Sequence, residues 1–131
     1  MQVSPFFVWK DSFNLGVERI DGQHQCLFEV MNRLYVSLAS GDPEPIVINA
    51  LNDLRFYASQ HFGEEEAILA RAGYPEMEKH RAQHGYFSAQ LESFDVRRPK
   101  ASEALSFLKD WFLQHILGTD RKTEEWLRRS A

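Results

Sequence analysis

The segment from residue 43 to residue 72 has inward-type residues at alternating steps of four and three, and this spacing limits the possible folds more than any other feature. The positions are Val47, Leu51, Leu54, Ala58, His61, Glu65 and Ile68. Such a stripe occupies one face of an α-helix and does not fit a β-strand, whose faces alternate every two residues. The same spacing recurs in three further segments, which predicts an all-α protein.

Breaks that contain glycine or proline separate the four segments. They lie at residues 40–43, 72–75 and 95–100. We therefore expect helices at about 20–40, 43–72, 75–94 and 100–118, with a C-terminal extension to about 128. Asp42 is expected to cap the second helix, and Gly73 is expected to end it in a left-handed conformation.

Short connections make consecutive helices antiparallel, so the predicted fold is an up-down-up-down antiparallel four-helix bundle in one domain, residues 1–131. Residues 1–19 do not fit the helical pattern. Phe6, Phe7, Trp9 and Phe13 make this segment too apolar for a free tail. We expect an N-terminal aromatic arm that packs against the bundle.

The overall charge and the apolar runs exclude several classes of partner. The net charge is −4, from 15 basic and 19 acidic residues, and no basic patch suggests nucleic acid. No apolar stretch approaches the roughly 20 residues that cross a bilayer, and the first residues lack the basic start of a signal peptide. A single cysteine, Cys26, suits a reducing cytoplasm. We expect a cytoplasmic monomer, because the bundle closes its own core.

All five histidines of the chain lie on the predicted inward faces. They are His24, His61, His80, His84 and His115. A lone histidine on such a face is more often a core residue with a hydrogen-bond partner than a ligand. Five buried imidazoles without partners, however, would cost about 1–3 kcal/mol each. The set therefore indicates a shared partner inside the bundle.

Two acidic residues accompany these histidines. Glu65 follows His61 by one helical turn and should point inward, whereas Glu64 and Glu66 are expected to face solvent. Asp120 follows His115 by five residues and would point away from it in a regular helix. It faces inward if the helix widens into an i to i+5 turn or ends there. The alternative is an aspartate on the surface at a helix end; we expect a ligand.

These seven donors exceed what one metal ion can bind but suit two, with Glu65 and Asp120 bridging the pair. One ion would then have three histidines. The other would have two, which leaves a vacancy for a small ligand. An imidazole-rich set suits iron, copper, zinc or nickel better than calcium or magnesium, and the spacing does not choose among them.

The ordered pattern resembles the hemerythrins, specifically the single-domain bacteriohemerythrins. It reads His24 … His61-x-x-x-Glu65 … His80-x-x-x-His84 … His115-x-x-x-x-Asp120. The lead-in WKDSFNLGVERIDGQH, residues 9–24, is also similar to the N-terminal arm of that family. The resemblance extends over nearly the whole chain, and all seven ligand positions are filled.

The resemblance implies a non-haem di-iron centre, with an oxo or hydroxo bridge, that binds O2 reversibly. By similarity, one iron is held by His80, His84 and His115, and the other by His24 and His61. Glu65 and Asp120 bridge the two irons. Reversible binding requires a dry pocket, and side chains next to the ligands are the expected walls. They are Leu27, Phe62, Phe87, Trp111, Phe112 and Ile116, although each also suits plain core packing.

The expected function is that of an oxygen carrier, store or delivery protein, with an oxygen-consuming protein as a candidate recipient. One alternative is an oxygen or iron sensor, and another is a di-iron redox enzyme such as a peroxidase. Ferritin-like di-iron enzymes use two Glu-x-x-His motifs, and the sequence contains neither. We therefore expect a binding protein and not an enzyme.

Overall fold

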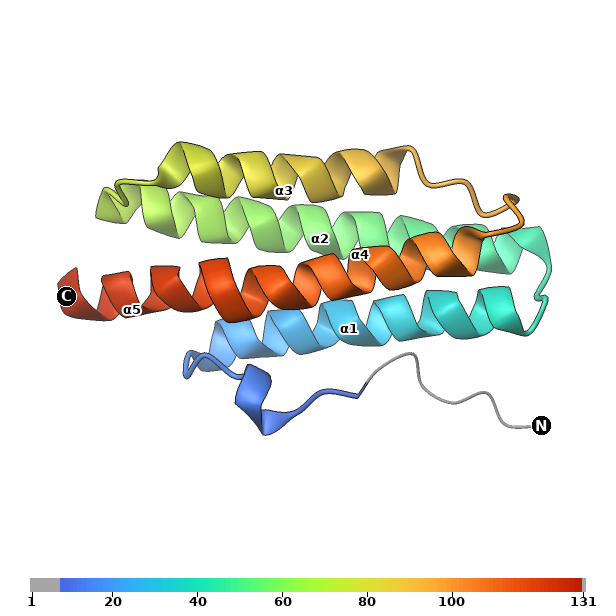
Figure 1. The fold of residues 1–131 in the computed structure, drawn as a ribbon, viewed down its shortest axis with the longest axis horizontal. Helices are drawn as coiled ribbons and strands as arrows, with labels where there is room; N and C mark the ends of the chain where they lie inside the picture. Colours follow the sequence, from blue (N-terminus) through green and yellow to red (C-terminus); the bar gives the residue numbers. More distant parts are fainter. Residues whose placement is uncertain (1–7, 131) are drawn as a thin grey trace.

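The computed structural model describes residues 8–130, with the side chains of residues 8–129. Four long helices run antiparallel: α1 (Glu18–Ala39), α2 (Glu44–Ala72), α3 (Met77–Glu92) and α4 (Ala101–His115). A π-helical turn, Ile116–Asp120, joins α4 to α5 (Arg121–Ser130), so that α4 and α5 form one continuous rod (Figure 1). We call this segment the π-turn. The predicted all-α four-helix bundle is confirmed, and the described residues include no strand.

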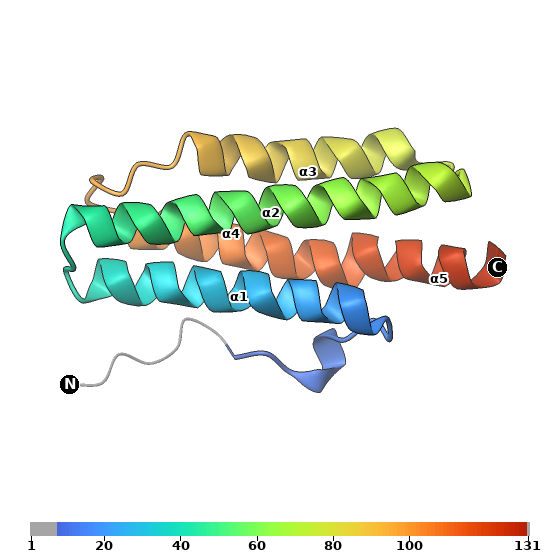
Figure 2. The ribbon, with the colours of Figure 1, turned by 180° about the vertical axis from the view of Figure 1, so that it is seen from behind.

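Each long helix packs against two neighbours: α1 contacts α2 and α4, and α3 also contacts α2 and α4. Figure 2 shows the bundle from behind, with α1 and α2 side by side. This arrangement brings four helix ends together at one end of the molecule, where α1 and α3 begin and α2 and α4 finish. In the described part of the chain, no helix is both long and apolar enough to cross a membrane.

The helix termini agree only partly with the expected capping residues. Gly73 ends α2 with φ 74°, the left-handed conformation predicted for it. Asp42 does not cap α2, because the cap position is Pro43. The Asp42 carboxylate instead accepts a hydrogen bond from the Ser37 hydroxyl at 2.9 Å. The first turn of α2 closes through the Pro43 carbonyl, which accepts from the backbone of Ile46 and Val47.

The inward face of α2 departs from the predicted stripe at its last position. Ile68 is 40% exposed, whereas Leu69 is fully buried. Leu69 follows Glu65 by four residues, so the stripe takes a second consecutive step of four there. Each residue rotates the helix by about 100°, so a step of four places Leu69 roughly 40° from Glu65, still on the buried face.

The bundle interior has two halves along its long axis. The half opposite the histidines is filled with hydrocarbon, including the fully buried Leu34, Leu51, Leu54 and Leu105. Between these leucines and the histidines, four phenylalanines, one from each long helix, pack ring against ring. These are Phe28, Phe62, Phe87 and Phe112, with centroid separations of 5.3–6.4 Å. We call them the phenylalanine layer.

The N-terminal arm lies alongside α1, as predicted for its described part (Figures 1 and 2). Trp9 and Phe13 pack edge-to-face on Phe28, with centroids 5.0 and 6.2 Å away. The Arg128 guanidinium of α5 donates to the Leu15 carbonyl, and Arg121 donates to the Ser12 carbonyl at 2.8 Å. The arm is therefore held by α1 and α5 together. The predicted contacts of Phe6 and Phe7 lie outside the described residues.

Candidate metal centre

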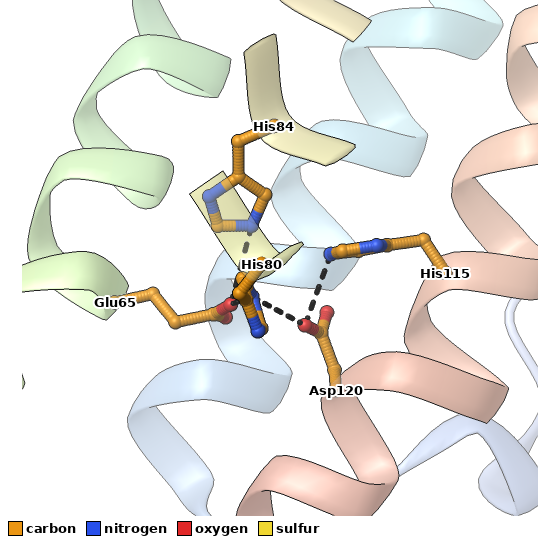
Figure 3. Close-up of side chains that lie close together, drawn as sticks. All are labelled: Glu65, His80, His84, His115 and Asp120. Carbon is orange, nitrogen blue, oxygen red and sulfur yellow. Dashed lines mark hydrogen bonds and ion pairs between the residues drawn. The ribbon is translucent and has the colours of Figure 1, made fainter. Parts of the chain in front are cut away.

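All seven predicted donors converge at the end of the bundle where α1 and α3 begin. His24 comes from α1, His61 and Glu65 from α2, His80 and His84 from α3, and His115 and Asp120 from α4 and the π-turn. Each residue is at most 5% exposed. Figure 3 shows five of them, with the Glu65 and Asp120 carboxylates pointing toward the imidazoles of α3 and α4.

The donor atoms form two groups that share the same two acids. Glu65, His80, His84, His115 and Asp120 each offer one atom within 4.8 Å of the others. His24 and His61 form a second group with the same Glu65 and Asp120. We call these the three-histidine position and the two-histidine position. Two acids common to both groups are in the right place to bridge a pair of ions.

The donor atoms of these side chains crowd around a common centre. His24 Nε2 and His61 Nε2 lie 3.0 Å apart. The Asp120 carboxylate lies 3.3 Å from His24 Nε2 through Oδ2 and 3.1 Å from His115 Nε2 through Oδ1. His80 Nε2 contacts Glu65 directly. Every imidazole thus turns its Nε2 toward the interior of the site.

The π-turn explains how Asp120 reaches this centre. In a regular α-helix, five residues would rotate Asp120 roughly 140° away from His115. The wider i to i+5 turn takes up the extra residue, and both side chains are buried on the same side of the rod. The helix does not end at the turn, because α5 continues for ten residues. The predicted local widening is confirmed, and the alternative of a surface aspartate is wrong.

Hydrogen bonds from outside the centre orient the rings of four histidines. His61 Nδ1 donates to Gln23 Oε1 at 2.6 Å, and His115 Nδ1 donates to Gln83 Oε1 at 2.6 Å. These amide oxygens have no hydrogen to give, so each Nδ1 carries the proton and each Nε2 presents a lone pair to the centre.

The two remaining outer bonds are at the three-histidine position. His84 Nδ1 donates to the Glu66 carboxylate at 2.8 Å. His80 Nδ1 lies 3.3 Å from the Thr123 hydroxyl oxygen, whose own hydrogen goes to the Thr119 carbonyl. Such outer partners orient the rings of metal-ligating histidines.

In the metal-free centre, the buried acids and histidines shift one another's pKa values. Burial would raise the pKa of the Glu65 carboxyl, but contacts with His61, His80 and His84 outweigh it and hold that pKa well below its usual range. Burial would likewise lower the pKa of His80, but Asp120 and Glu65 raise it to about 9. Without metal, the site therefore combines ionised acids with a protonated His80.

Several buried atoms in the centre lack a hydrogen-bond partner, and these atoms test whether metal ions fit. They are His84 Nε2, His115 Nε2 and both oxygens of Asp120, all facing the centre. A buried polar atom without a partner costs about 1–3 kcal/mol. Metal ions would satisfy all four atoms at once, and nitrogen and carboxylate donors are the ligands that iron and similar ions take. The residues present fit a pair of ions.

Aromatic side chains cover the centre on the side of the hydrocarbon half. Phe62 stacks on the His84 ring at 4.0 Å, and Trp111 stacks on the His115 ring at 5.2 Å. Phe112 lies 5.9 Å from the His24 ring, and Phe87 contacts both Phe62 and Phe112. The predicted wall residues Leu27 and Ile116 are fully buried. The six residues are therefore available as pocket walls, with Trp111 partly exposed.

The expectation that Glu64 and Glu66 face solvent is only partly met: both side chains are partly exposed, but each also has hydrogen-bond partners. Glu66 binds His84, and Glu64 accepts hydrogen bonds from Gln23 and Arg19. Gln23 and Gln83 were also missed. The sequence does hold a signal for them: each directly precedes a histidine of the centre, His24 or His84, on its own helix. Each then binds a histidine on the next helix along the chain.

Fold and centre together define a four-helix-bundle protein built to hold a pair of metal ions between its helices. Comparison with known proteins gives the particular family. The family model of the hemerythrin HHE cation-binding domain matches residues 15–127. The chain therefore belongs to the hemerythrin family.

Individual relatives agree with this assignment. A bacteriohemerythrin of Clostridium acetobutylicum is 36% identical over 88% of this chain and 97% of its own length. A myohemerythrin of Riftia pachyptila is 29% identical over 88% of this chain and 89% of its own length. A crystal structure of a hemerythrin variant has the same fold, with a TM-score of 0.83, 23% identity, and coverage of 93% of this chain and 97% of that one.

Proposed function

We propose that this hemerythrin-family protein binds O2 reversibly at two iron ions held by the seven residues of the centre. The observation that carries the proposal is the pair of donor groups, which share Glu65 and Asp120 and differ in their histidines. With three histidines at one position and two at the other, the two-histidine ion has room for a further ligand. When bound, the irons supply the electrons that hold and release O2.

The protein's own residues would contribute the conditions for reversibility. His61, His84 and His115 each direct Nε2 at the centre because Nδ1 is committed to an outer acceptor. Phe62 and Phe112 lie next to the histidines and exclude water from the side facing the core. Water and protons promote loss of the bound oxygen as peroxide. An apolar wall beside the open position keeps them away and therefore supports the release of unchanged O2.

Visible absorption of the iron-loaded, anaerobically reduced protein tests this function. We expect a charge-transfer band that appears when air is admitted, disappears when it is removed, and returns over repeated cycles. A direct and permanent passage to the oxidised spectrum would contradict reversible binding and would favour the sensor or the redox enzyme. Assaying the same sample for turnover of hydrogen peroxide with a reducing dye would distinguish those two.

We further propose that the working form is a cytoplasmic monomer that delivers or stores O2 and does not act as an enzyme. The single cysteine suits a reducing compartment, and the long helices enclose their own core. Sedimentation of the iron-loaded protein should give one species of the 15.3 kDa chain mass. A concentration-dependent dimer would contradict the monomer without affecting the proposed O2 site.

A further inference from the structure

The outer hydrogen bonds of the centre are distributed unequally between the two metal positions. At the three-histidine position, each ring has an outer acceptor: Thr123, Glu66 or Gln83. At the two-histidine position, His24 Nδ1 is buried and has no hydrogen-bond partner among the described residues. His61 has one, Gln23. All outer hydrogen bonding of that position therefore passes through one side chain.

Gln23 is itself held in a fixed orientation. Its amide nitrogen donates to Glu64 Oε2, and Glu64 Oε1 accepts from the Arg19 guanidinium at 2.8 Å. The Glu64 carboxylate is partly exposed and forms an ion pair with Arg19, so both of its oxygens act as acceptors. The amide nitrogen must then face Glu64, and the amide oxygen must face His61. A flipped amide would set oxygen against carboxylate.

The chain of contacts begins at the surface. Arg19 is largely exposed, Glu64 is partly exposed, and His61 is buried. Gln23 also lines an open groove of about 770 Å³ between α1 and α2, together with Gln60 and His61. The Gln23 amide therefore lies between the solvent in this groove and a ring of the two-histidine position.

We propose that Gln23, locked by Glu64 and Arg19, is the positioning residue of the two-histidine ion. It fixes His61 with Nε2 toward the centre and so determines how tightly that ion is held, whereas the three histidines of the other ion have outer partners of their own. The inference rests on the proposed function only in that the seven residues bind two ions. Loss of an outer partner typically lowers metal affinity 10–100-fold.

The test uses the full chain loaded with two Fe²⁺ ions under anaerobic conditions and then mixed with a ferrous chelator. The variant Gln23→Leu keeps the approximate shape of the side chain but removes the acceptor. We expect one of the two ions to be released at least about tenfold faster than in the unmodified protein. The release of the other should be accelerated less, because only the shared acids connect it to Gln23. The matched control is Gln60→Leu in the same groove, with both rates unchanged.

A charge-conserving exchange provides the rescue. In the double variant Gln23→Glu/Glu64→Gln, the carboxylate at position 23 accepts from both His61 and the new amide, whose oxygen accepts from Arg19. Every hydrogen bond is retained, so the release rate should return to that of the unmodified protein or fall below it. Because this variant keeps all polar groups paired, it also remains informative if Gln23→Leu folds poorly.

Each result decides the question. Selective loss of one ion in Gln23→Leu, together with recovery in the exchange variant, supports the positioning role. Unchanged release, equal acceleration of both ions, or failure of the exchange to restore the rate would overturn it. If the unmodified protein itself bound fewer than two ions, the proposed function would fail instead, and the two failures are thereby distinguished.

Discussion

Glu65 is the residue on which both metal positions depend most. Its carboxylate is buried, lies within the donor groups of both positions, and contacts histidines from α2 and α3. Asp120 has the same shared place from the opposite side of the bundle. The two acids therefore tie the positions together, whereas each histidine serves one of them.

The change Glu65→Ala should abolish binding of both ions. Removal of a donor shared by both positions should lower affinity by more than the roughly 10–100-fold expected for an outer partner. Iron per chain after desalting is the measurement, and Glu78→Ala, an acid in the first turn of α3 away from the centre, is the control. Retention of one ion by the Glu65 variant would show that the carboxylate does not bridge.

Stability of the metal-free protein should depend on pH through His80. Its pKa rises from the ordinary 6.5 to about 9 in the folded chain. A group with a raised folded pKa stabilises the fold fully below its unfolded value and loses that contribution as pH rises through the folded one. The melting temperature should therefore fall between about pH 7 and pH 10.

The metal-loaded protein provides the comparison for this pH experiment. An ion bound at Nε2 takes the place of the proton, so the fall in melting temperature should be absent or much smaller. A second check is His80→Asn without metal, which should also lack the fall. Equal pH profiles for the metal-free protein and this variant would mean that another group is responsible.

The residues of the centre were predictable because ligands must lie on the inward faces of their helices. With 3.6 residues per turn, such a face appears in the sequence as steps of three and four. Asp120 does not follow this periodicity: the His115-x-x-x-x-Asp120 interval left a widened turn or a helix end open, and the structure contains the widened turn. The outer partners were not predictable in the same way. Gln23 reaches His61 across a helix pair, so its role depends on packing and side-chain rotamer, which spacing along one helix does not specify.

At the scale of helices, the turn between α2 and α3 determines where the His61 and His80 segments face each other. Gly73 ends α2 with φ 74°, a region that disfavours residues with a Cβ. Gly85 lies within α3, and a Cβ added there would meet nothing within 4 Å. The two glycines can therefore be compared by mutation: the backbone conformation requires glycine at position 73 but not at position 85.

We expect Gly73→Ala to lower the free energy of unfolding by about 1 kcal/mol because of its left-handed conformation. Gly85→Ala should raise it by about 0.5–1 kcal/mol, since alanine is the better helix former. Denaturant unfolding of both metal-free variants would measure the difference. Destabilisation of similar size in both would mean that loss of glycine matters at these sites for a reason other than φ.

The ends of the helices were less predictable than their faces. Asp42 was expected as the cap of α2, but its carboxylate serves the Ser37 hydroxyl, and Pro43 takes the cap position. An Asp-Pro pair is compatible with either arrangement. The choice depends on how the chain crosses from α1 to α2, which is a tertiary contact and not a local preference.

For the molecule as a whole, removal of metal should destabilise the fold. The seven donors come from all four long helices and the π-turn, so the centre links the entire bundle, and its buried atoms lose their partners when the ions leave. Ions present at about 1,000 times their dissociation constant stabilise a folded protein by about 4 kcal/mol. The corresponding loss in melting temperature is on the order of 10 °C. Scanning calorimetry before and after chelation measures it, and an unchanged melting temperature would count against the centre.

The division of the interior into a metal-binding half and a hydrocarbon half determines where the chain unfolds locally when the ions are lost. The buried Leu34, Leu51, Leu54 and Leu105 do not contact the ions, so loss of the ions should leave the leucine half packed. Local opening should therefore be confined to one end. In hydrogen–deuterium exchange of the metal-free protein, amides near His24, His61 and His115 should exchange fast while those near Leu34 and Leu105 stay protected. The leucine half then keeps the four helices in register, so that an emptied chain can be reloaded without refolding.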